Sequence, residues 1–242
     1  VQAEIDTTKL TVSVVTSYPF SEDIRISLSL EAPKSFPFHF RVPGWCASPA
    51  LSINGESAAC AMTKKGFICI NREWGEGDVI DLSFPMNLCI TERCEKLLVD
   101  EEGNEPYFAR YGEDRNLDDF VDGAPYVTVE RGPLLFALPL DRYSDAQHAL
   151  VWDRDAPEKS FKVQIHEMEK DWDWSHHAPV TIEAQMQRID WDFVSGNPEM
   201  PPEPYAPQSA AMKMVQLVPY GTPDFRISMF PVIQPYKATP LG

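Results

Sequence analysis

The stretch FPFHFRVPGWCASPALSINGESAACAMTKKGFICINREWGEGDVIDLSFPM, from Phe36 to Met86, decides the fold class. Every second residue from Phe36 to Val42 is apolar, and because successive side chains of a strand point to opposite faces, this predicts a strand with one buried face. Asn54-Gly55 suits the two positive-φ positions of a type I′ hairpin turn. Phe67–Ile70 is an apolar run typical of a strand buried on both faces. Four short strands separated by turn residues, with no helical period, predict an antiparallel sheet.

The same alternation returns along the rest of the chain, and one helical turn is expected at Glu92–Leu98. The further predicted strands are Leu10–Val14, Ile24–Leu30, Val127–Glu130 and Leu134–Leu138 on either side of a bend at Arg131-Gly132-Pro133, Phe161–Ile165, Val180–Ala184, Met214–Val218 and Arg226–Phe230. The 22 prolines against 12 glycines also favour strands and loops over long helices. We therefore predict an all-β chain with little helix, made of two tandem antiparallel β-sandwich domains of jelly-roll or immunoglobulin-like type. Residues 1–140 form the first and residues 141–242 the second, and the closing strands at 214–230 return to either sandwich.

Composition narrows the classes of partner. The 242 residues carry a net charge of −16, which argues against nucleic acid and anionic membranes as partners. No apolar run approaches the roughly 20 residues of a membrane span. The chain starts at Val1 with neither an initiator methionine nor a basic and apolar signal region. We therefore expect a piece of a longer protein or a processed product, and we assign no compartment.

No metal motif is complete. The five cysteines are not arranged as CxxC, so we expect small buried hydrophobes rather than zinc ligands: Cys46, Cys60, Cys69, Cys89 and Cys94. His176 and His177 are adjacent and would point to opposite faces of a strand. His166-Glu167 starts like HExxH, but residue 170 is lysine, so His166 is predicted to end a strand instead.

Three tryptophans are the candidate substrate-binding residues: Trp172, Trp174 and Trp191. The first two lie in the segment DWDWSHH, residues 171–177, where an indole face beside carboxylates would suit a sugar ring. The alternative is that these tryptophans pack across a sandwich. The acidic stretch at residues 113–122 could supply two carboxylates for glycoside hydrolysis, although a solvated loop is the simpler interpretation.

Several motifs resemble, in order, one known family. They are Tyr18-Pro19-Phe20, Phe40-Arg41-Val42-Pro43-Gly44-Trp45-Cys46, Ile53-Asn54-Gly55-Glu56, Arg72-Glu73-Trp74 with Gly77-Asp78-Val79, Phe84-Pro85-Met86, Glu130-Arg131-Gly132-Pro133-Leu134, Leu217-Val218-Pro219-Tyr220-Gly221 and Arg226-Ile227-Ser228-Met229-Phe230-Pro231. This order is similar to the β-sandwich region C-terminal to the catalytic barrel in β-L-arabinofuranosidase-like enzymes, glycoside hydrolase family 127 and its relatives. The likeness is interrupted between about residues 141 and 211.

The resemblance implies that the chemistry lies outside this chain. Enzymes of this family hold the sugar in a helical (α/α) barrel, where a zinc-bound cysteine is the nucleophile, supported by a glutamate and an adjacent Cys-Cys pair. This sequence has no Cys-Cys dipeptide, and Cys46 stands in Gly-Trp-Cys, outside that motif. We therefore expect no catalytic residue and no metal ligand here, with zinc confined to the missing barrel.

Three functions follow as alternatives. The first is a non-catalytic portion of a glycoside hydrolase acting on arabinose-containing glycans, whose partners are the N-terminal helical barrel of the same enzyme and a second copy in a homodimer. The second is a stand-alone carbohydrate-binding module that uses exposed tryptophans. The third, an enzyme complete in this chain, would need two carboxylates about 5–10 Å apart in a cleft.

Overall fold

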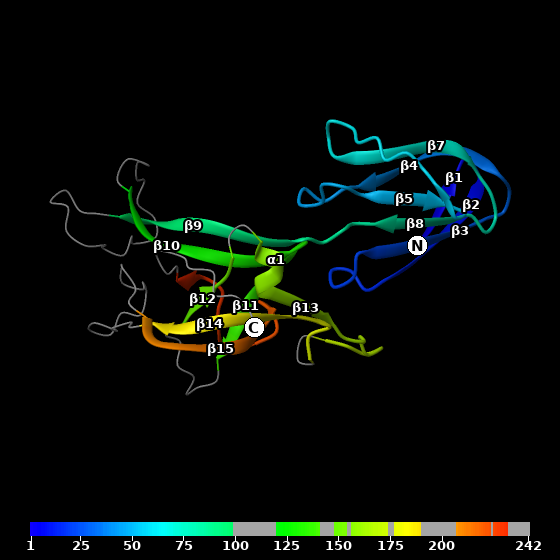
Figure 1. Cartoon of the computed structure of the whole chain (residues 1–242). Coiled ribbons are helices and arrows are strands. Elements are labelled where there is room, and N and C mark those ends of the chain that lie inside the picture. The colour runs from blue at the N-terminus through cyan, green and yellow to red at the C-terminus, as the bar shows by residue number, and fades with distance from the viewer. Residues whose placement is uncertain are drawn as a thin grey trace. The chain divides into compact units, whose positions relative to one another are not determined.

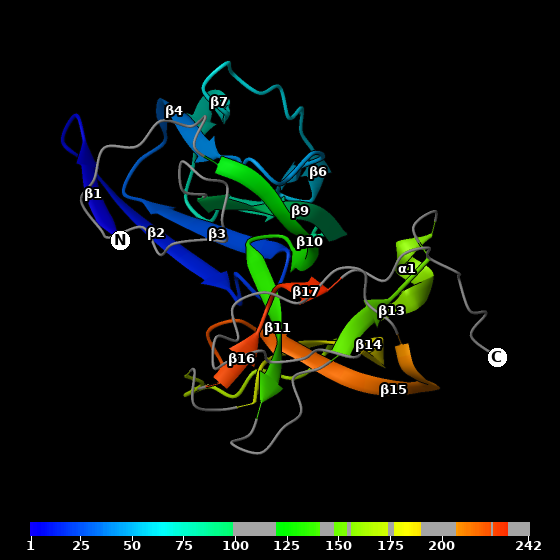
Figure 2. The ribbon, with the colours of Figure 1, turned by 90° about the vertical axis from the view of Figure 1, so that its left-hand side faces the viewer.

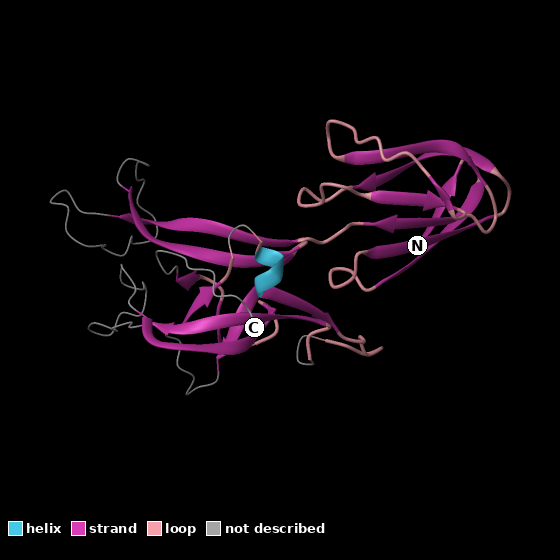
Figure 3. Cartoon of the chain, viewed as in Figure 1, coloured by secondary structure: helices cyan, strands magenta, loops and turns pink. Residues whose placement is uncertain are grey.

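The structure, a computed structural model, describes residues 1–98, 120–140, 148–153, 156–173, 177–189, 207–223 and 225–231. Among these residues the regular elements are strands, apart from the single helical turn α1 (Pro157–Ser160) (Figure 1; Figure 3). This confirms the predicted all-β, sandwich-like class. Within the described part no helix is long and apolar enough to cross a membrane.

The chain forms two compact units. Unit 1 consists of Val1–Asn87 together with the short segment Arg131–Leu134, and unit 2 consists of Leu88–Glu130 and Leu135–Gly242. The sequence-based boundary at residue 140 falls inside unit 2. The compact units therefore do not coincide with the two proposed sandwiches, and the limits of the folding domains stay a prediction.

Unit 1 is a sandwich of a large and a small sheet (Figure 2). The large sheet has the strand order β1 (Gln2–Ile5), β2 (Thr8–Thr16), β3 (Asp23–Leu30), β8 (Val79–Ser83), β5 (Ala50–Ile53) and β6 (Glu56–Ser57). The small sheet pairs β4 (Lys34–Arg41) with β7 (Phe67–Trp74). Apolar residues from both sheets form one buried cluster, in which Leu28 and Ile80 of the large sheet join Ile68 and Trp74 of the small one. The Trp74 indole N–H donates to the Phe36 carbonyl (3.0 Å), which satisfies its polar atom inside this core.

The predicted hairpin is confirmed, and two details of the opening stretch are wrong. Asn54 (φ 53°) and Gly55 (φ 83°) form the turn between β5 and β6. The four strands do not form one sheet, because β4 and β7 leave it to form the opposite layer. The β7 strand is also buried on one face only: Ile68 is inaccessible, whereas its neighbour Cys69 is exposed.

Unit 2 is built on one nine-stranded sheet. The main path runs β12 (His148–Val151), β14 (Val180–Ile189), β15 (Pro207–Pro219), β11 (Leu134–Leu140), β10 (Phe120–Arg131) and β17 (Phe230–Pro231), and the side strands are β13 (Phe161–Ile165), β16 (Phe225–Ile227) and β9 (Leu88–Leu98). β12 and β17, at the two ends of this path, are in contact, so the sheet curls round on itself. Its fully buried side chains include Val127, Phe136, Leu150, Ile182 and Phe230.

The structure decides two expectations, the conformation of Glu92–Leu98 and the pairing of the closing strands. The helical turn at Glu92–Leu98 is wrong, because the segment is the second half of β9, which pairs with β10. The closing strands β15, β16 and β17 pair with β10 and β11, which lie before residue 141 in the sequence.

Candidate functional site

The candidate site is a cleft of about 680 Å³ in unit 2. It lies between β15 and the 14-residue connection that joins β13 to β14, residues 166–179. The described residues that line it are His166, Glu167, Glu169, Trp172, His177, Ala178, Thr181, Gln216, Val218 and Thr222. The volume is in the range of natural small-molecule sites, about 300–1,000 Å³.

Strand pairing assembles this cleft from segments far apart in the sequence. β13 pairs with the start of β14, and a backbone hydrogen bond from His166 N–H to the Pro179 carbonyl (2.7 Å) extends the ladder by one residue. β14 in turn pairs with β15, which brings Gln216 next to Thr181. His166 therefore stands directly after a strand, as predicted.

The lining of the cleft includes a buried hydroxyl with two side-chain partners. Thr181 is 4% exposed. Its Oγ1 accepts a hydrogen bond from Gln216 Nε2 at 3.2 Å and lies 3.0 Å from His166 Nε2. Buried polar groups are costly unless they are paired, so these contacts hold all three side chains in place.

Trp172 forms one side of the cleft and is held by two hydrogen bonds. Its indole N–H donates to the His177 carbonyl at 2.8 Å, and its backbone N–H donates to the Glu169 carbonyl at 3.1 Å. Of the three predicted tryptophans, only this one is seen in a cleft. Trp174 and Trp191 lie outside the described residues, so their assignment stays a prediction.

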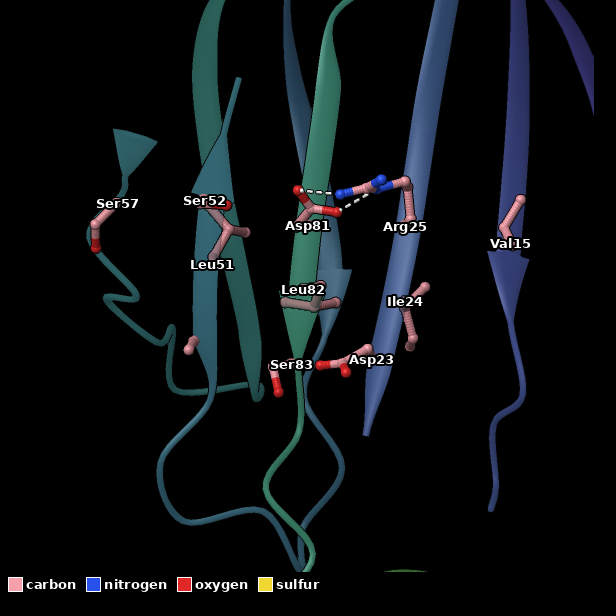
Figure 4. A pocket seen from close by; sticks show the side chains of 11 residues that line it. Val15, Asp23, Ile24, Arg25, Leu51, Ser52, Ser57, Asp81, Leu82 and Ser83 are labelled. Carbon is pink, nitrogen blue, oxygen red and sulfur yellow. Dashed lines mark hydrogen bonds and ion pairs between the residues drawn. The ribbon is translucent and has the colours of Figure 1, made fainter. Parts of the chain in front are cut away.

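A second cleft, of about 620 Å³, lies on the large sheet of unit 1 (Figure 4). Arg25 of β3 and Asp81 of β8 are cross-strand partners in its lining, and they make a two-pronged contact of 2.6 and 3.2 Å. The hydrogen bond from Arg25 holds the pKa of Asp81 below its usual range. Serines such as Ser52 and Ser83 surround the pair, and the described lining has no aromatic side chain.

The described residues do not fit a zinc site. Among them, no group of three histidine, cysteine or acidic side chains could hold a metal ion. Cys46 is buried as expected, and desolvation raises the pKa of its thiol. Cys69 and Cys89 are exposed, so for them the expectation of burial is wrong. The acidic stretch at residues 113–122 and the thiol of Cys94 lie outside what is described.

Sequence reasoning missed most of the polar cleft. Thr181 interrupts the apolar alternation of Val180 and Ile182 and would be expected to face solvent, yet all three residues are buried because both faces of β14 are covered here. Nothing in the local pattern links Thr181 to Gln216, 35 residues later. The available signal was the density of polar and aromatic residues between His166 and His177.

The family scan and a solved structure both point to the same family of glycoside hydrolases. The family described as "Beta-L-arabinofuranosidase, GH127 middle domain" matches residues 1–86. A crystal structure of a GH127 β-L-arabinofuranosidase from Geobacillus stearothermophilus T6 has 25% identity and a TM-score of 0.57, covering 92% of this chain and 29% of its own. The chain is a GH127-related region.

Two further solved structures support the fold of this GH127-related region. One described as a glycoside hydrolase has 20% identity and a TM-score of 0.61 and covers 96% of this chain. A GH127 β-arabinofuranosidase has 17% identity and a TM-score of 0.59, with the same coverage. The chain spans 34% and 33% of their lengths, so in each case it corresponds to one part of a longer protein. A search of curated proteins finds no match.

Proposed function

We propose that this GH127-related region is the non-catalytic β-sandwich portion of a glycoside hydrolase that acts on arabinose-containing glycans. It braces a helical (α/α) barrel that carries the active site, and it contributes to a homodimer. The observation that carries the proposal is the match of residues 1–86 to the middle domain of the β-L-arabinofuranosidase family. The chain's share of 29–34% of the longer solved structures leaves room for a separate catalytic portion.

The chemistry of the family resemblance supports the same division. A zinc-bound thiolate nucleophile needs several clustered ligands, and the described cysteines are distributed over different segments, with Cys46 buried and Cys69 on an exposed strand face. The proposal therefore places the zinc and the nucleophile in the barrel, and no catalytic step is assigned to this chain.

The test compares hydrolysis by the chain and by a longer polypeptide. The 242-residue chain, assayed with 4-nitrophenyl β-L-arabinofuranoside, is expected to give only the rate of the buffer blank. The polypeptide from the complete reading frame is expected to hydrolyse the same substrate, and a version that ends before Val1 is expected to lose thermal stability and activity. Turnover of this substrate by the 242-residue chain alone would overturn the accessory role.

The proposed homodimer is tested by a separate measurement of molecular mass. Light scattering during size-exclusion chromatography should give twice the monomer mass for the full-length polypeptide. A monomeric mass at concentrations up to about 100 μM would remove the dimer from the proposal and leave the bracing role intact, since a dissociation constant above that value is too weak for a stable assembly.

A further inference from the structure

We infer that the cleft of unit 2 binds a neutral oligosaccharide, with Trp172 as the stacking surface and Glu167 and Glu169 as hydrogen-bond acceptors for sugar hydroxyls. This site goes beyond the accessory role, and it does not depend on that role being correct. It is a binding site, and no bond is made or broken in it.

The indole of Trp172 is oriented before any ligand arrives. Its N–H is already used by the His177 carbonyl at 2.8 Å, so the ring offers the cleft its apolar surface rather than a hydrogen-bond donor. A ring fixed in this way loses little conformational freedom on binding, which favours affinity. The apolar C–H face of a pyranose or furanose ring is a natural partner for such a surface.

Other side chains in the lining are equally fixed. Thr181 holds His166 at 3.0 Å and Gln216 at 3.2 Å, so these side chains are positioned by a buried contact rather than by the ligand. Both belong to paired strands or to the first residue after one. Sites built on such elements hold their geometry better than sites built on loops alone.

The charge of the cleft selects the class of ligand. Its described lining contains two exposed carboxylates, Glu167 and Glu169, and two imidazoles, His166 and His177, and neither lysine nor arginine. Two carboxylates without a cationic partner in the lining repel phosphate, sulfate and uronate groups. They can accept hydrogen bonds from hydroxyl groups, and charged acceptors make the stronger bonds of this kind. A neutral polyhydroxyl ligand satisfies both conditions.

The cleft of unit 1 provides a contrast. Its charged groups, Arg25 and Asp81, already satisfy each other through two contacts, and the described lining has no ring on which a sugar could stack. We therefore place the oligosaccharide on unit 2 and use unit 1 for a control variant.

The experiment uses the intact chain and saturation-transfer-difference NMR with four probes. Arabinotriose and cellotriose are the neutral sugars, trigalacturonate is the anionic sugar, and choline is a cation that an aromatic ring with carboxylates could also hold. At least one neutral trisaccharide is expected to receive saturation, with a dissociation constant in the millimolar range. Trp172→Ala is expected to weaken it by about tenfold, the effect typical of an aromatic anchor.

Matched variants separate binding from folding. The double change Glu167→Gln and Glu169→Gln should weaken binding about threefold or more because charged acceptors become neutral. Glu158→Gln on α1 and Ser52→Ala in the other cleft should leave it unchanged. Circular dichroism should show that each variant is folded.

Several results would overturn the inference. They are the absence of saturation on both neutral sugars, equal binding by Trp172→Ala, stronger binding of trigalacturonate, or binding of choline alone. The outcome is independent of the hydrolysis assay, because sugar binding with turnover overturns only the accessory role, and absent binding without turnover overturns only this site.

Discussion

The buried guanidinium of Arg131 contacts two other segments of unit 1. Arg131 is 8% exposed, and its two terminal nitrogens contact Glu22 Oε1 (3.0 Å), the Phe20 carbonyl and Met86 Sδ (both 3.4 Å). Desolvation lowers the pKa of this arginine, and the charge of Glu22 counteracts that effect. Because burying an unpaired charge is more costly than exposing one, the two partners are not equivalent.

This asymmetry gives the first prediction. Glu22→Gln leaves a buried cation without its counter-charge and should lower the free energy of unfolding by about 2 kcal/mol. Arg131→Met leaves a carboxylate that water can reach, since the Glu22 side chain is 35% exposed, and should cost about 1 kcal/mol. Urea unfolding at pH 7 measures both, and a larger loss for Arg131→Met would contradict the argument.

The neighbouring glycine has no room for a side chain. Gly132 has φ 57°, and a Cβ there would lie 2.7 Å from Met86 Cγ and 2.8 Å from its Sδ. Gly132→Ala should therefore destabilise the protein by about 1–3 kcal/mol, through backbone strain and overpacking against a buried side chain. Gly44→Ala is the control, because nothing lies within 4 Å of the added methyl group. Equal melting temperatures for the two variants would contradict both the backbone strain and the overpacking against Met86.

At the scale of an element, the turn from Gly75 to Asp78 joins β7 to β8 through one carboxylate. Asp78 accepts from the Gly75 N–H (2.8 Å) and from Asn54 Nδ2 (2.7 Å), and Asn54 in turn accepts from the Val79 N–H. Desolvation would raise the pKa of Asp78, but the two hydrogen bonds and the charge of Arg72 together lower it below its usual value. The turn is thus tied to the β5–β6 hairpin through the ionised form of this aspartate.

The lowered pKa of Asp78 determines how the stability of the protein changes with pH. A carboxyl group whose folded pKa is depressed stabilises the protein above its unfolded pKa of about 4, and this contribution is lost as the pH falls through the lower folded value. Asp78→Asn should cost about 1–2 kcal/mol at pH 7 and clearly less at pH 3. Thermal unfolding at several pH values measures this, with Asp23→Asn, an exposed aspartate of β3, as the control. A cost independent of pH would mean that the ionised state contributes nothing.

An element can be predicted from the sequence when its conformation depends on neighbouring residues, and not when it depends on pairing with a distant strand. Asn54-Gly55 is predictable because the turn needs two positive-φ residues in a row, which is a local requirement. The separation of β4 and β7 into a second layer cannot be predicted in this way, because the alternation of apolar residues identifies a buried face but not the strand that pairs with it. Glu92–Leu98 was misassigned for the same reason: its charged residues suit a helical turn, and pairing with β10 decides otherwise.

In the candidate site, too, the local features are predictable from the sequence and the long-range contacts are not. Trp172 is visible in the sequence as an aromatic residue among acids and histidines. The Thr181–Gln216 contact is not visible there, because it comes from the register of β14 against β15. The ring of Trp172 is therefore a local feature of the sequence, and the contact between Thr181 and Gln216 is a product of the tertiary fold.

At the scale of the whole molecule, the order of strands along the chain differs from their order in the sheets. β10 and β11 precede residue 141 in the sequence, yet β11 is paired with β15 and β16, and β10 with β17. Unit 2 is therefore completed only when the last strands of the described chain have been added. Such non-local pairing favours cooperative loss of the whole sheet over independent loss of its halves.

A truncation after residue 140 tests this directly. The fragment 1–140 keeps β10 and β11 but removes β15 and β16, so Phe136 and Leu138 lose their pairing with Pro219 and Ile227. Unpaired edges with apolar side chains promote association between chains, so the fragment should form larger oligomers or aggregates than the intact chain under the same conditions. Hydrogen exchange should show protected amides in β2, β3 and β8 and fast exchange in β10 and β11, because the large sheet of unit 1 retains its paired strands. A monomeric fragment with protected β10 and β11 amides would instead establish residues 1–140 as a folding domain, with the boundary where the sequence alone places it.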